Sequence, residues 1–299
     1  MPLTVVRAQY DPSFSQYWEM ETAFNPAATG RGNRLHAVGM YAMSMVGFEN
    51  APKTMVATAD MPFYAMRNMH GVGVIFMNDQ LGLFSHQRIQ AQYSYKQKLL
   101  GGRLGIGVQA GLLTEKFNGS KLDLENSGDP AFSNSEVNGN ALDLGAGLYY
   151  DHTNWYVGVS ALHLTAPTVR LGERNELQVD PSFYFTAGYN IKLRNPLLSI
   201  RPSVFAVTDA VAYKADVTCR LLYTHDEKVL WAGVGYSPTN SVTGYVGGSF
   251  HGVNLGYSYE MYTGGIKIGN GSHTLTVSYE TEIDFAKHGR NMHKSVRLL

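Results

Sequence analysis

Residue groups that could carry out catalysis or bind a cofactor are few and incomplete in this sequence. Gly105-Ile106-Gly107 matches part of a dinucleotide-binding turn, but these glycines lie within a predicted strand and no helix start follows them. The ten histidines have neither helical ligand spacing nor a cysteine cluster beside them, so the sequence predicts no zinc site. No Gly-x-Ser-x-Gly turn is present, and neighbouring Ser85 and His86 would point to opposite faces of a strand. We therefore expect no enzyme activity and no bound cofactor.

Charged side chains fall into two groups that suggest different roles. Asp123, Glu125 and Asp129 lie in a long polar connection and could bind calcium through carboxylate oxygens, although a solvated acidic loop is the simpler interpretation. The second group lies within extended segments and consists of Arg88, Lys96, Lys214, Asp216 and Arg220. These charges need water or polar partners on one face of a sheet, because an unpaired charge is costly to bury.

The segments around these charges follow the two-residue period of a β-strand. In residues 103–113, five apolar side chains alternate with three glycines and Gln109. In residues 211–223, an apolar row that includes Cys219 alternates with four polar or charged residues. A soluble β-sandwich also has one-sided strands, but its core would not accept the polar rows. The pattern favours a sheet with lipid outside and water or protein inside.

Fourteen such segments predict an all-β fold, a transmembrane antiparallel β-barrel of about 14 strands. Their ranges are 34–45, 53–61, 70–77, 88–97, 103–113, 140–150, 154–163, 182–191, 197–207, 211–223, 228–236, 240–250, 253–261 and 273–280. Most approach the roughly 9–11 residues that a tilted strand needs to cross a bilayer. Aromatic residues recur near the ends of the apolar rows, as at membrane interfaces. Many of the 32 glycines fall on the polar face, which would be costly in a sandwich core.

Connection lengths predict the orientation of the barrel. An even number of strands places both ends of the barrel on one side, where most turns are short and residues 62–68 are expected to form the longest. The long connections, 115–139 and 165–181, fall on the opposite side. Outer-membrane barrels have short periplasmic turns and long extracellular loops. We therefore expect a multi-pass protein of the bacterial outer membrane with both termini in the periplasm.

Composition argues against several other classes of protein. The sequence has no run of 18 apolar residues and so predicts no transmembrane helix. Lys and Arg together number 24, as do Asp and Glu, which argues against a basic nucleic-acid-binding surface. A single cysteine excludes an internal disulfide.

The chain is expected to have four parts. Val6-Arg7-Ala8 before Gln9 fits the small-residue cleavage rule, so the first part is interpreted as the end of a signal peptide; an ordinary cytoplasmic start is the alternative. The last part is a basic tail, either solvated or in contact with an acidic partner. The four parts are a residual signal peptide, a periplasmic N-terminal segment that could plug the barrel, the barrel itself and a periplasmic tail, at 1–8, 9–33, 34–281 and 282–299.

Short blocks of residues follow one another along the chain in a recognisable order. The first contains Asp11, Pro12, Phe14, Ser15, Gln16 and Tyr17, followed by Asn25, Pro26 and Gly30. Later blocks cover 47–54, 78–82, 128–132 with Asp129 and Pro130, 181–189 and 271–273. Together they resemble the PorP/SprF family of type IX secretion membrane proteins over residues 8 to about 280. Family members usually end at an aromatic residue after the last strand, whereas nineteen residues follow Glu280 here.

This resemblance implies a non-enzymatic outer-membrane component of the type IX secretion system, a system that also serves gliding motility. Such a protein docks or anchors secreted cargo carrying a C-terminal sorting domain, or links the machinery to a periplasmic peptidoglycan-binding protein. Its other implied partners are outer-membrane lipid and further type IX secretion components, with no nucleic acid. The block residues become candidates for partner binding, and loops 115–139 and 165–181 become candidate contacts for cargo or translocon.

Two roles are open for the charges that would face the lumen. They could pair with one another across strands, or they could hold residues 11–30 inside or beneath the barrel. We favour the second role, because Phe14, Tyr17, Trp18 and Phe24 would otherwise expose aromatic surface. An outer-membrane porin or solute channel is the alternative function and would need an open lumen. A hydrolase would need a Ser, a His and a carboxylate within hydrogen-bonding reach near the rim.

Overall fold

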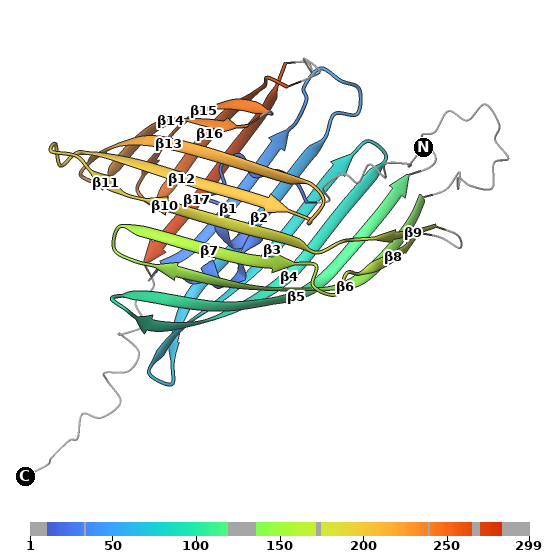
Figure 1. Cartoon of the computed structure of the whole chain (residues 1–299), viewed down its shortest axis with the longest axis horizontal. Helices are drawn as coiled ribbons and strands as arrows, with labels where there is room; N and C mark the ends of the chain where they lie inside the picture. The colour runs from blue at the N-terminus through green and yellow to red at the C-terminus, as the bar shows by residue number, and fades with distance from the viewer. Residues whose placement is uncertain are drawn as a thin grey trace, which may run out of the picture.

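A computed structural model describes residues 11–32, 34–118, 136–171, 175–238, 240–264 and 270–282 of the chain. In this part, fourteen antiparallel strands close into a barrel (Figure 1). The predicted signal-peptide end at 1–8, nearly all of the tail, and the three acidic residues considered for calcium lie outside the described residues. No helix in the described ranges is long and apolar enough to cross a membrane.

The wall strands follow one another in chain order around the barrel. Strand β1 closes it against β17, with Arg34 opposite Glu282 and Met43 opposite His273. The wall consists of β1 (Arg34–Met43), β2 (Lys53–Ala65), β3 (Asn68–Leu81), β4 (Phe84–Leu99), β5 (Gly102–Asn118), β6 (Glu136–Asp151), β7 (Trp155–Leu162), β10 (Ser182–Tyr189), β12 (Leu198–Thr208), β13 (Tyr213–His225), β14 (Lys228–Ser237), β15 (Ser241–Phe250), β16 (Val253–Tyr262) and β17 (Ser272–Glu282). Each of the fourteen predicted segments overlaps one of these strands, so the predicted fold class is confirmed.

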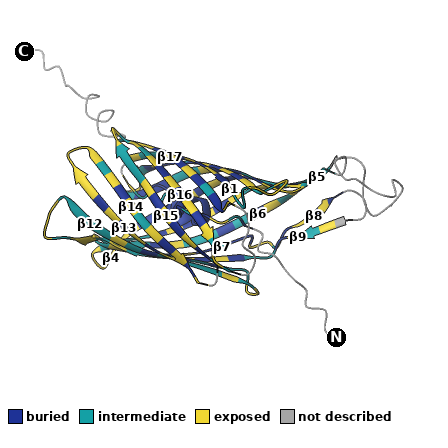
Figure 2. Ribbon diagram, turned by 90° about the horizontal axis from the view of Figure 1, so that it is seen from above, coloured by how far each residue is buried: buried dark blue, intermediate teal, exposed yellow. Residues whose placement is uncertain are grey.

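Burial alternates along the strands, as Figure 2 shows by its bands of exposed and buried residues. Ile106 and Leu112 on β5 are 48% and 55% exposed, whereas Gln109 between them is 3% exposed. Cys219 on β13 is exposed on the outer face, and its neighbour Arg220 is buried on the inner face. Because side chains alternate with a period of two, the apolar rows surround the barrel and the polar rows line its lumen.

The two ends of the barrel differ in their connections. We call the end where β1 begins and β17 finishes the terminal rim, and the opposite end the distal rim. On the terminal rim, β2 continues to Ala65 and β3 starts at Asn68, so the expected long turn at 62–68 is wrong. Only Met66 and Arg67 form this turn, with φ of 49° and 66°. Two consecutive left-handed residues match the right-handed twist of a tight hairpin, although neither residue is glycine or asparagine.

The distal connection at 165–181 is folded rather than extended. It carries a hairpin of β8 (Thr168–Leu171) and β9 (Asn175–Gln178). Val169 on β8 and Val179 pack with Leu113 of β5 and Ala141 of β6. The hairpin therefore covers the inner face of the wall near the distal rim. On the terminal rim, the two-residue strand β11 (Ile191–Lys192) continues the pairing of β10 with β12.

Candidate functional site: the lumenal segment

The start of the described chain enters the barrel instead of lying outside it. Residues 11–30, which we call the lumenal segment, contain the one-turn helix α1 (Glu21–Phe24) and the 3-10 helix η1 (Pro26–Ala28). In Figure 1 this dark blue segment lies within the ring of strands. Asn25 starts η1 by accepting a hydrogen bond from the backbone N–H of Ala27 at 2.9 Å, which is the usual role of an N-cap residue.

Aromatic residues of the segment form the apolar core inside the barrel. The Tyr17 ring stacks on Phe205 of β12 with centroids 5.1 Å apart, and Phe24 meets the same ring edge-on at 5.0 Å. The Trp18 ring contacts Tyr245 of β15 at 5.0 Å. Aromatic contacts of this kind add stabilisation beyond burial alone. The segment is therefore packed into the lumen as a core, and does not lie loosely in it.

Asp11 anchors the beginning of the segment through a buried charge network. The Arg88 Nη1 atom lies 3.2 Å from Asp11 Oδ1, and His163 Nε2 lies 3.2 Å from Asp11 Oδ2. Tyr184 also donates a hydrogen bond to Asp11, and Asp143 contacts His163 Nδ1 at 3.0 Å. Burial by itself would raise the pKa of Asp11, but the positive charges of His163 and Arg88 hold it well below its usual value. Asp11 is therefore ionised and paired inside the barrel.

Wall side chains also satisfy the backbone of the segment, which has no sheet partner of its own. Lys96 Nζ donates to the Ala27 carbonyl at 3.0 Å, and Arg88 Nη2 donates to the Ala23 carbonyl at 3.1 Å. The backbone N–H of Gly30 donates to Asp60 Oδ2 at 2.6 Å. Because buried backbone groups need partners, the inward polar residues of β2 and β4 determine where the segment lies.

A second ion pair joins Glu21 of the segment to Arg31, the residue that follows it, near the terminal rim. Arg31 contacts Glu21, and both residues hydrogen bond to the hydroxyl group of Tyr149 on β6. Burial raises the pKa of Glu21, with the Arg31 charge opposing that rise. The segment is thus fixed to the wall by the Asp11–Arg88 ion pair at its beginning and by the hydrogen bonds of Glu21 and Arg31 to Tyr149 further along.

The PorP/SprF family model, described as a type IX secretion system membrane protein, matches residues 6–279. The chain belongs to the PorP/SprF family. The expected family is therefore confirmed over nearly the whole chain. A comparison with curated proteins gives no match.

The solved structures to which this PorP/SprF protein is similar are distant in sequence. CymD, a monoaromatic hydrocarbon channel, is 11% identical, with 92% of this chain and 95% of that chain covered and a TM-score of 0.52. A TodX mutant channel is 10% identical over 84% and 89% of the two chains, with a TM-score of 0.45. BamA from Haemophilus ducreyi is 8% identical over 84% and 71%, with a TM-score of 0.43. The likeness to CymD shows a shared β-barrel fold. Family membership and this fold together support a multi-pass protein of the outer membrane.

The PorP/SprF block residues at the start of the chain are mostly inside the barrel. Gln16 accepts a hydrogen bond from Thr276 Oγ1 of β17 at 2.7 Å, and Tyr17 shares one with Ser203 Oγ of β12 at 2.8 Å. Asn25 donates to the Leu148 carbonyl of β6 at 3.1 Å. Phe14, Pro26 and Gly30 are buried, Pro12 and Ser15 are partly buried, and Asp129 and Pro130 lie outside the described residues. The structure therefore brings the first block together as a lumenal core.

The five lumen charges have different surroundings. Arg88 and Lys96 bind the lumenal segment directly. Lys214 donates to Ser13 Oγ at 2.5 Å and lies 3.8 Å from Asp216. The Arg220 guanidinium carbon lies 3.9 Å from the centroid of the Trp18 ring. Four of the five charges therefore contact the lumenal segment, and Lys214 also lies near Asp216 within the wall.

Sequence reasoning missed several residues of this site. Tyr184 lies between Phe183 and Phe185 in an aromatic run, and its inward position was not predicted. His163 follows the end of β7, and Asp143 lies on β6, so only the fold brings them to Asp11. The period-two parity of residues 182–191 was the one signal that could have placed Tyr184 inside. In the described ranges, no group of three His, Cys, Asp or Glu residues could hold a metal ion.

Glycines on the inner face let the segment approach the wall closely. A Cβ atom added to Gly107 of β5 would lie 2.2 Å from the Ala27 nitrogen, and one added to Gly71 of β3 would lie 2.1 Å from the Thr29 carbonyl oxygen. A Cβ at Gly147 of β6 would lie 2.2 Å from Asn25 Oδ1. The glycines on the polar face of the strands thus provide room for the backbone of the segment.

Replacing Gly107 with alanine should therefore destabilise the packed segment. The new methyl group would overlap the backbone at Pro26 and Ala27, and such overpacking typically costs about 1–3 kcal/mol. Urea unfolding of the detergent-solubilised protein, followed by tryptophan fluorescence, measures this loss. Gly244→Ala on β15 is the matched control, since nothing lies within 4 Å of the added atom. Equal unfolding free energies for the two variants would contradict the proposed close approach.

Proposed function

We propose that this protein is a plugged docking component of the type IX secretion system, acting by binding and not by catalysis. Its membership of the PorP/SprF family supports a role in that system. The observation that carries the docking role is the lumenal segment, which is fixed by the buried pair of Asp11 and Arg88 with side chains 1% exposed. A barrel filled in this way offers its rims, and not its lumen, to other molecules.

In this proposal the two rims have different partners. The terminal rim, where β1 begins and β17 finishes, faces the periplasm and contacts a peptidoglycan-binding protein or other secretion components. The distal rim faces the exterior, where connections 115–139 and 165–181 contact cargo with a C-terminal sorting domain or the translocon. The β8–β9 hairpin supports this role for the second connection, because it presents a folded surface. Arg170 and Glu176 pair across this hairpin at 2.9 Å and are both exposed.

A porin or solute channel is the second candidate function, because CymD is a hydrocarbon channel with the same fold. That likeness supports a barrel fold but does not indicate which solute would pass through the barrel. Transport through the lumen would require the lumenal segment to leave its aromatic core and the ion pair of Asp11 with Arg88. Single-channel recording of the full chain separates the two candidates, since the docking role predicts a closed barrel.

Crosslinking and affinity purification from outer membranes test the docking role. We expect a tagged full chain to recover other type IX secretion components. A variant in which residues 168–178 are replaced by a short Gly-Ser linker should recover less cargo or translocon. Met66→Ser is its control, because Met66 is 92% exposed on the terminal rim, away from the hairpin. Recovery of the barrel alone, together with steady conductance, would overturn the proposal in favour of the channel.

A further inference from the structure

Strand β6 is longer than its neighbour β7, so part of one of its edges has no partner strand. β6 has 16 residues and β7 has 8. The other edge of β6 pairs with β5 over the whole strand, whereas β7 pairs only with residues 146–151. Among the described strands, none pairs with the remaining part of this edge at the distal rim.

The connection that follows β7 covers a short part of this edge and then leaves it. The backbone N–H of Leu164 donates to the Leu144 carbonyl at 2.9 Å, and Thr165 Oγ1 donates to the Leu142 carbonyl at 3.2 Å. The chain then forms the β8–β9 hairpin, which is a separate two-stranded sheet. The edge is therefore open from residue 141 toward the start of β6.

Asn138 and Asn140 have their backbone groups on the open edge. The N–H and C=O groups of every second residue point to the same side of a strand, so those of both asparagines share the side of Leu142. Within the described ranges, no hydrogen bond reaches these groups. Both asparagine side chains are exposed. Because amides are costly to place in hydrocarbon, this part of β6 lies outside the bilayer.

Residues 137–141, which we call the β6 edge, lack the features that usually protect a free strand edge. Such edges carry charges or proline, or are covered by other elements. The β6 edge reads Val-Asn-Gly-Asn-Ala and has neither a charge nor a proline. The hairpin strands, by contrast, carry the exposed charges of Arg170 and Glu176. The hairpin packs on the inner face of the β6 edge, where a Cβ added to Gly139 would lie 2.2 Å from the Arg170 carbonyl oxygen.

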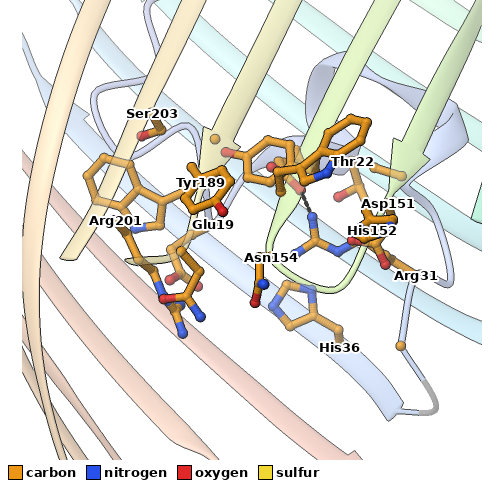
Figure 3. A pocket seen from close by; sticks show the side chains of 18 of the residues that line it. Glu19, Thr22, Arg31, His36, Asp151, His152, Asn154, Tyr189, Arg201 and Ser203 are labelled. Carbon is orange, nitrogen blue, oxygen red and sulfur yellow. Dashed lines mark hydrogen bonds and ion pairs between the residues drawn. The ribbon is translucent and has the colours of Figure 1, made fainter. Parts of the chain in front are cut away.

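The opening at the terminal rim is different, because charged side chains there balance one another. A cavity of about 420 Å³ is lined by residues of both charges. Figure 3 shows Arg201 and Glu19 on one side of this cavity and Arg31 on the other. Arg31 contacts Glu21, and the Glu19 carboxylate attracts both Arg201 and Arg220. The unmatched groups that could bind a chain are therefore the backbone groups of the β6 edge.

We propose that the β6 edge binds an extended, uncharged segment of a partner protein as an added strand. A segment of about five residues would exchange backbone hydrogen bonds with Asn138 and Asn140. Leu142 and Leu164 are 59% and 48% exposed where the pairing with β7 stops, which favours apolar side chains in the segment. The inference rests on the proposed function for the side of the membrane, because the distal rim then faces the exterior.

The geometry of the membrane argues against a second copy of this chain as the partner. Two copies in one membrane have the same orientation, and a copy that turns its β6 edge toward the first is rotated by half a turn about the membrane normal. Because barrel strands are tilted by about 35–45°, the two β6 strands would cross at about 70–90° and could not pair. The added strand therefore comes from a different protein.

Amide hydrogen exchange of the full chain in detergent micelles, followed by NMR, tests the open edge. In the free chain we expect the amides of Asn138 and Asn140 to exchange faster than those of Gly139 and Ala141, which point toward β5. A pentapeptide of alternating threonine and valine, at about ten times its dissociation constant, should slow both asparagine amides by about tenfold. The same peptide with every backbone amide N-methylated is the control, since it has no N–H to donate.

Asn140→Pro provides a second measurement, by fluorescence anisotropy of the labelled peptide. Proline removes the N–H on the open edge and leaves the pairing of Gly139 and Ala141 with β5 in place, so we expect a folded barrel with about tenfold or more weaker peptide binding. Asn140→Ala is the matched control. It also loses the side-chain hydrogen bond with Thr114 but keeps the backbone N–H.

Three results would overturn the proposal. Slow exchange of the asparagine amides in the free chain would mean that the edge is already paired within the chain. Equal affinity of the wild type and a folded Asn140→Pro variant would show that the open-edge N–H is not used, and equally tight binding of the N-methylated peptide would exclude strand addition. If Asn140→Pro does not fold, the exchange measurement on the wild type still decides. None of these results affects the recovery of secretion components, which tests the docking role separately.

Discussion

Deletion of residues 10–30 should turn the closed barrel into an open pore. The lumenal segment supplies the aromatic core of the lumen, where Phe14, Tyr17, Trp18 and Phe24 are buried. Without it, a fourteen-stranded wall has a polar lining and is wide enough to hold water. We expect conductance in planar bilayers to rise by about tenfold or more relative to the full chain, since wide barrels carry aqueous channels.

The wall itself must remain folded for this result to be informative. All fourteen wall strands pair with one another, and closure of β1 on β17 does not involve the deleted residues. Far-UV circular dichroism and heat-dependent electrophoretic mobility should therefore match those of the full chain. A folded deletion variant with unchanged conductance would show that the segment does not block the lumen.

Arg88→Ala should cause the largest loss of stability among single substitutions at this site. It would leave the Asp11 carboxylate buried without the guanidinium that neutralises it and would remove the donor to the Ala23 carbonyl. Breaking one partner of a buried pair typically costs about 3–5 kcal/mol. The unfolding free energy in urea, measured in detergent, gives the size of this effect.

Arg103→Ala is the matched control for this measurement. Arg103 pairs with Asp151 at 3.0 Å, but both side chains are about one third exposed, at 35% and 27%. An exposed pair contributes only about 0–1 kcal/mol. A double replacement, Asp11→Leu with Arg88→Met, should recover part of the loss, because removing both charges leaves neither one unpaired. Losses of equal size for Arg88→Ala and Arg103→Ala would contradict the buried network.

The wall could be predicted from the sequence because its signal is local. Residues 103–113 alternate apolar and small or polar side chains, and the same period fixes which face meets lipid. The geometry of the turns could be predicted less well from the sequence. Residues 62–68 contain a proline, yet Pro62 lies within β2 opposite Gly71, and the left-handed turn falls on Met66 and Arg67. Neither residue type signals such a turn, so the expected long connection was wrong.

The lumenal site depends on contacts that no local pattern encodes. Asp11 meets His163, which is 152 residues away in the chain, and Gln16 meets Thr276, which is 260 residues away. Aromatic residues at the start of the chain predicted that the segment would need cover. They could not indicate that Tyr184, with an apolar ring, would face inward and donate a hydrogen bond. The glycines on the polar face are visible in the sequence, but their contact with Ala27 and Thr29 depends on the three-dimensional register.

The attachment of Gln16 to β17 has a consequence for biogenesis. The lumenal segment is synthesised first, but its partners include Thr274 and Thr276 on the last strand of the wall. Its contacts with these two residues can form only after that strand is in place. Contacts between such distant parts of a chain form late and slowly. The lumenal segment therefore packs in its final position only when the barrel is complete. A newly inserted barrel would leak ions until its last strand is in place.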